Sequence, residues 1–70
     1  INPSDAAALA NRGLSFHALR KFELAIEDFD RAIALDGREP SYLNLRGAAY
    51  RQLGKIEEAI LDYDRAIALK

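Results

Sequence analysis

Few residues of this chain have the types that nucleophilic catalysis requires. Such a site needs a nucleophile, a base and an acid that orients the base. The sequence contains one histidine, His17, and no cysteine. Ser15 is two positions from His17, so a helix would turn these two side chains in different directions. These residues therefore do not predict an acyl-transfer site.

Three pairs of carboxylates are the next candidates, because two neighbouring acids with different pKa values can perform acid–base chemistry. The pairs are Asp28 with Asp30, Glu57 with Glu58, and Asp62 with Asp64. Each pair is expected on the outer face of a helix, where we interpret it as ordinary solvated charge. The carboxylates therefore do not predict an active site.

Metal and phosphate chemistry lack the residue patterns that they need. One histidine and no cysteine leave only a weak, oxygen-only metal site. Glycines bind phosphate when they gather in one loop, whereas the glycines of this chain are scattered at Gly13, Gly37, Gly47 and Gly54. The sequence predicts a protein that is not an enzyme and has no cofactor and no metal.

Composition limits the class of protein further. The chain has 70 residues, 50% hydrophobic and 30% charged, which predicts a single globular domain over residues 1–70. A net charge of −1 argues against nucleic acid as a partner, since phosphate binding needs a surplus of basic residues. The longest apolar stretch, Ala6–Ala10, is far short of the roughly 20 residues of a membrane span. No membrane partner is expected, and the protein is taken as soluble and cytoplasmic by default, although nothing identifies the compartment.

The sequence repeats itself at an interval of 34 residues. Ala6–Asp36 aligned with Pro40–Lys70 gives 15 identities in 31 pairs, far more than the roughly two expected from average residue usage. We therefore divide the chain into a first repeat at residues 6–39 and a truncated second repeat at 40–70. Residues 1–5 are interpreted as a cap and the remnant of a preceding repeat, which predicts that the chain is a piece of a longer array.

Apolar residues within each repeat recur at helical spacing. The series Phe22, Ala25, Ile26 and Phe29 follows one face of a helix at positions i, i+3, i+4 and i+7. Pro40 suits the first turn of a helix, and Ser4 suits the N-cap position. The helices are predicted near 5–19, 22–35, 40–53 and 56–69, and the short loops between them make neighbouring helices antiparallel.

A period of 34 residues built from two helices resembles the tetratricopeptide repeat. In each repeat a large residue, a small residue and an aromatic follow at fixed offsets, and the second helix adds two alanines around an aromatic. These residues are Leu9, Gly13, Phe16, Ala25, Phe29 and Ala32, and at the same offsets Leu43, Gly47, Tyr50, Ala59, Tyr63 and Ala66. The resemblance implies an all-α fold, an α-solenoid of two helix-turn-helix repeats whose four antiparallel helices form a right-handed superhelical stack. Gly37 in place of the closing proline is one departure from the motif, and Arg20 stands where the second repeat has Gly54.

The resemblance also implies a function, because the first helices of such repeats line a concave groove. Residues 6–19 and 40–53 of the first helices carry a charge of +3, and residues 22–35 and 56–69 of the second helices carry −6. This difference predicts a mildly basic groove and an acidic protein or peptide partner. The candidate groove residues are Leu14, His17, Ser41, Asn44, Ala48, Arg51 and Gln52. Some members of the family bind the carboxylate tails of heat-shock chaperones, but the residues at the corresponding positions here disfavour that ligand.

Arg12 and Arg46 have an alternative role, because each stands next to the glycine at which the two helices of its repeat are expected to pack closely. They either contribute positive charge to the groove or pair with Asp28 and Asp62.

The predicted function is therefore a non-catalytic protein–protein interaction module that holds a peptide or partner surface in a helical groove. The alternative is a structural element that forms homo-oligomers through its uncapped repeat faces. The predicted self-association face consists of Ile60, Leu61, Ile67 and Leu69.

Overall fold

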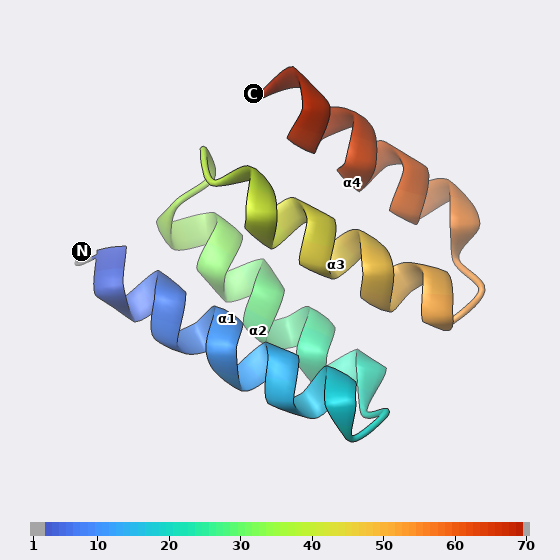
Figure 1. Ribbon diagram of the computed structural model, residues 1–70, viewed down its shortest axis with the longest axis horizontal. Helices are drawn as coiled ribbons and strands as arrows, with labels where there is room; N and C mark the ends of the chain where they lie inside the picture. Colours follow the sequence, from blue (N-terminus) through green and yellow to red (C-terminus); the bar gives the residue numbers. More distant parts are fainter. Residues whose placement is uncertain (1–2, 70) are drawn as a thin grey trace.

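Four α-helices form the protein in a computed structural model that describes residues 3–69. They are α1 (Pro3–Ala18), α2 (Phe22–Leu35), α3 (Pro40–Gln52) and α4 (Ile56–Ala68). Consecutive helices run antiparallel and lie side by side in chain order (Figure 1). The Cα atoms span 32 × 28 × 13 Å, and the described residues contain no strand. The predicted all-α fold of two helix pairs is confirmed.

The helix boundaries differ from prediction at the first helix. Ser4 was predicted as its N-cap, but α1 begins at Pro3 and already includes Ser4. A proline fits the first turn because that turn leaves its backbone nitrogens without intrahelical partners. Pro40 occupies the start of α3 in the predicted way, with the Glu39 side chain accepting a hydrogen bond from the Ser41 backbone N–H at 3.5 Å. The predicted remnant at residues 1–5 lies partly outside the described residues.

The turns inside the two repeats have the same geometry. The backbone N–H of Lys21 donates to the carbonyl of Phe16 at 2.8 Å, and that of Lys55 to Tyr50 at 2.9 Å. This bond closes a helix when the preceding residue adopts the left-handed conformation. That residue is Arg20 (φ 63°) in the first repeat and Gly54 (φ 79°) in the second. Arg20 therefore holds a conformation that favours glycine.

The core consists of small and aromatic residues where the helices approach closely. Phe29 is fully buried with Ala25 and Ala49. Its ring lies directly over Gly13, where a Cβ atom would come within 2.6 Å of the ring. Leu45 of α3 packs against this cluster and also against a second one that contains Ala10. Leu45 thus joins the two repeats into one core.

The left-handed turns give a stability prediction. Gly54→Ala should lower the free energy of unfolding by about 1 kcal/mol, because nothing lies near the added Cβ and only the backbone conformation becomes strained. Arg20→Gly removes the same strain but also the contact of the Arg20 guanidinium, 5.7 Å above the Phe22 ring. We expect a gain in stability smaller than about 1 kcal/mol from this variant. Urea denaturation of both variants measures the effects, and a gain from Gly54→Ala would contradict the account.

Candidate functional site

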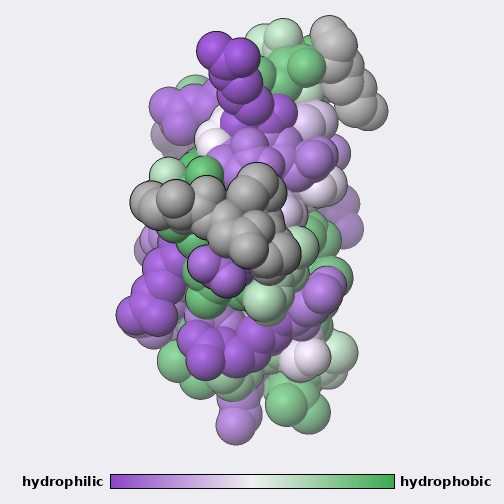
Figure 2. Space-filling model, turned by 90° about the vertical axis from the view of Figure 1, so that its left-hand side faces the viewer, coloured by the Kyte–Doolittle hydropathy of each residue, from purple (hydrophilic) through white to green (hydrophobic). Residues whose placement is uncertain are grey.

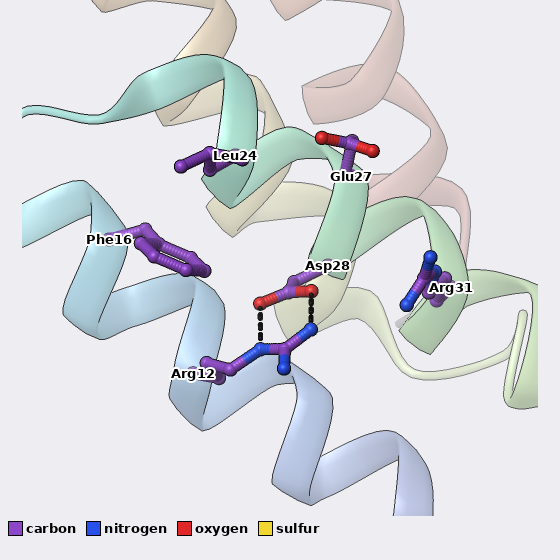
Figure 3. Close-up of a pocket in the computed structure, with 6 residues that line it drawn as sticks. All are labelled: Arg12, Phe16, Leu24, Glu27, Asp28 and Arg31. Atoms are coloured by element: carbon purple, nitrogen blue, oxygen red, sulfur yellow. Dashed lines mark hydrogen bonds and ion pairs between the residues drawn. The ribbon is translucent and has the colours of Figure 1, made fainter.

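An arginine of the first helix and a buried aspartate of the second hold each helix pair together. Arg12 donates from Nε and Nη2 to Asp28 Oδ2 and Oδ1, both at 2.8 Å (Figure 3). Arg46 donates to Asp62 in the same way, at 2.8 and 2.7 Å. We call these two bidentate pairs the first and second clamps. The pairing of both arginines with helix acids is confirmed.

The clamps correct the interpretation of two carboxylates as solvated charge. Asp28 and Asp62 are each only 2% exposed, so that interpretation was wrong for both. A carboxylate can be buried when a guanidinium satisfies both of its oxygens. Among the described residues, no buried polar side-chain atom lacks a hydrogen-bond partner. The remaining members of the three pairs are exposed, and these are Asp30, Glu57, Glu58 and Asp64.

The first clamp shifts the pKa of both its groups. Hydrogen bonds from Arg12 lower the pKa of Asp28 below its ordinary value and outweigh the opposing effect of burial. The same hydrogen bonds raise the pKa of Arg12. Asp28 is therefore ionised in the folded protein at neutral pH.

Arg46 makes a further contact that the sequence analysis missed. Its Nη1 donates to Asp30 Oδ1 of α2 at 2.8 Å, so one guanidinium binds carboxylates from both repeats. Its side chain is 16% exposed, against 58% for Arg12. One feature of the sequence indicates this contact, namely that Arg46 is 16 residues from Asp30 and also 16 residues from its clamp partner Asp62.

A hollow of about 230 Å³ opens beside the first clamp, between α1 and α2. Its walls combine two arginines, two acids and two apolar side chains, namely Arg12, Phe16, Leu24, Glu27, Asp28 and Arg31 (Figure 3). The described residues hold no group of three histidine or acidic side chains placed to bind a metal ion.

The predicted groove residues mostly have exposed side chains. Leu14 of α1 is 43% exposed. His17 is half-buried, and its ring and that of Phe22 form a T-shaped pair with centroids 5.0 Å apart. The α3 candidates lie at positions 41, 44, 48 and 51–52, and this spacing of three or four residues places them on one helix face. Of these, Ser41, Asn44, Arg51 and Gln52 are exposed and Ala48 is half-buried. Ligand binding by this set stays a prediction.

The predicted self-association residues lie on the surface of α4 and at its end. Ile60, Leu61, Ile67 and Leu69 are 51, 56, 69 and 41% exposed. Hydrophobic atoms also appear at the upper edge of Figure 2, near the C-terminal end of α4, on a face where hydrophilic and hydrophobic areas alternate. Assembly through this surface stays a prediction.

Two stacked helix pairs, each closed by its own clamp, define a helical-repeat protein. A family model for the tetratricopeptide repeat matches residues 6–38 and again residues 40–70. The chain belongs to the tetratricopeptide repeat family, whose repeats generally mediate protein–protein interaction and typically have no catalytic role. No curated protein matches the chain significantly. Within the described part of the chain, no helix combines the length and apolarity needed to cross a membrane.

The first clamp predicts a pH dependence of stability. Because folding lowers the pKa of Asp28 below its ordinary 3.8, its contribution is present above that value and is lost as the pH falls through the folded pKa. The free energy of unfolding should therefore decrease below about pH 4. Asp28→Asn should be less stable at neutral pH and lose less stability on acidification. Urea denaturation between pH 7 and 2 measures both effects, and parallel acid profiles for the two proteins would contradict the prediction.

Proposed function

We propose that the exposed faces of α1 and α3 hold a peptide or an extended segment of a partner protein. The main support is Arg51, an exposed cation on this surface that makes no ion pair with residues 3–69. A cation without an internal partner is available to a ligand carboxylate.

The clamps change the predicted charge of this surface. Arg12 and Arg46 were included in its positive charge, but both are neutralised by aspartates of the second helices. Arg51 is then the main remaining cation, with the half-buried His17 at the equivalent position of the first repeat. This arrangement favours one acidic or terminal carboxylate in the ligand over a long run of acids.

The neighbouring side chains suit the rest of a peptide. Exposed Asn44 and Gln52 offer amide hydrogen bonds on the same helix face as Arg51. Leu14 and Ala48 occupy equivalent positions in the two repeats and provide apolar contact. Such a surface suits a peptide of alternating acidic and apolar residues, held by helices that are already ordered.

The proposed affinity is weak, because two repeats present a short surface with one exposed cation. Binding of about micromolar strength at best is expected. It should weaken as salt is added, because salt screens contacts between exposed charges.

A pair of charge reversals tests the proposal. Arg51→Glu should weaken binding of acidic peptides from a library by about fivefold to tenfold, the cost of losing an exposed ion pair and adding repulsion. Arg65→Glu is the matched control, because Arg65 lies on α4 beside a separate hollow that Ile33 and Leu43 help to line. Fluorescence anisotropy with labelled peptides measures both variants. Equal losses, or a preference for basic peptides, would contradict the groove assignment.

A further inference from the structure

The contact between the two repeats shows how one helix pair receives the next. Arg46 of α3 reaches Asp30 of α2. Leu45 packs against the cluster that contains Ala10. The outer surface of one repeat therefore accepts a helix through an ion pair and apolar contacts.

The 34-residue repeat places equivalents of these contacts on two opposite outer surfaces. One surface belongs to α4 and the exposed side of α3. On it, Asp64 occupies the position equivalent to Asp30, and Asn44 the position equivalent to Ala10. The other belongs to α1, where Arg12 stands for Arg46. We call these the α4 outer face and the α1 outer face. Each carries one half of the contact that joins the repeats internally.

Two sets of residues that differ from the internal contact change in matched pairs, while Ala8 on the α1 outer face is the equivalent of Tyr42, which packs in the internal contact. Inside the protein, Leu45 packs against the cluster that contains Ala10. The equivalent of Leu45 on the α1 outer face is Asn11, and the equivalent of Ala10 on the α4 outer face is Asn44. An amide on one face alone would lose hydrogen bonds to water on docking, whereas amides on both faces can bond to each other.

A second matched pair involves the buried aromatic. Phe29 and Ala49 share one buried cluster, and their equivalents on the outer faces are Tyr63 and Ser15. Both changes add a hydroxyl group, so one face offers a tyrosine donor and the other a serine acceptor.

The ion-pairing groups on the outer faces are accessible. Arg12 Nη1, the equivalent of the Arg46 atom that binds Asp30, makes no hydrogen bond to residues 3–69. Asp64 is exposed and forms no ion pair within the same range. Ile60 and Ile67, which flank Asp64 on α4, are 51 and 69% exposed, whereas their equivalents Ile26 and Ile33 are half-buried.

We propose that the α4 outer face binds the α1 outer face of a second copy of this chain, with Arg12 of one copy paired to Asp64 of the other. The contact is head-to-tail, so it leaves one free face of each kind and continues into longer oligomers. This proposal goes beyond peptide binding, although the α4 outer face shares Asn44 with the proposed groove. The polar replacements make the contact weaker than the one inside the protein.

Blocking each face separately tests the proposal. Asp64→Arg places repulsion opposite Arg12 and blocks the α4 outer face. Asn11→Glu places a charge opposite Asn44, where docking would bury it without a partner, and blocks the α1 outer face. Both positions are exposed, and circular dichroism verifies that the variants keep their helices. Glu58→Arg is the matched control, because it makes the same charge change on α4 about 120° around the helix from Asp64.

Sedimentation velocity over a concentration series gives the result. The unmodified chain should form species larger than a dimer as its concentration rises, and Glu58→Arg should do the same. Each blocking variant alone should associate at least about tenfold more weakly. An equimolar mixture of the two should form a dimer and stop there, because each variant retains one intact face.

Three outcomes would overturn the proposal. The first is a chain that remains monomeric at millimolar concentration, which would show that the α4 outer face does not bind a second copy and would favour a different protein as its partner. The second is undiminished assembly of either blocking variant alone, which would indicate a symmetric contact. The third is a mixture of the two variants that stays monomeric.

Discussion

A buried carboxylate between two helices is the constraint on which the rest of this structure depends. Asp28 and Asp62 are almost fully excluded from water, and an ionised acid at such a position needs a charged partner that satisfies both oxygens. The guanidinium groups of Arg12 and Arg46 fill this role from the facing helix. Each arginine also lies over an aromatic ring one turn further along its helix, at 5.9 Å from Phe16 and 5.8 Å from Tyr50. These contacts fix which faces of the paired helices meet.

The same constraint shapes both proposed surfaces. Two of the three arginines on α1 and α3 are paired with aspartates in the clamps. Arg51 is therefore the main positive charge available to a groove ligand. Because Arg46 of the second clamp also binds Asp30 of α2, this clamp helps to hold the second repeat against the first. The first clamp lacks such a contact within residues 3–69 and leaves Arg12 largely exposed. Internal pairing thus determines which charges remain for partners.

Helices and clamps were predictable from the sequence, because both depend on short, repeated spacings. The apolar pattern around Phe29 identifies a helix, and the identity of Arg12 with Arg46 and of Asp28 with Asp62 indicates one contact used twice. The contact between Asp30 and Arg46 was not predicted because it depends on how the repeats stack, which no single repeat encodes. The position of Arg20 over Phe22 was missed for a similar reason, since it follows from the left-handed backbone of the turn. Whether the groove residues bind a ligand depends on a partner that the sequence does not contain.

A double-mutant cycle on the second clamp tests most directly whether buried ion pairs hold the helix pairs together. Arg46→Ala, Asp62→Asn and the double variant are compared with the unmodified chain by urea denaturation. We expect Arg46→Ala to cost more stability when Asp62 is present than when asparagine replaces it, with a coupling free energy of about 0.5–3 kcal/mol. Additive losses, with no coupling beyond experimental error, would contradict it.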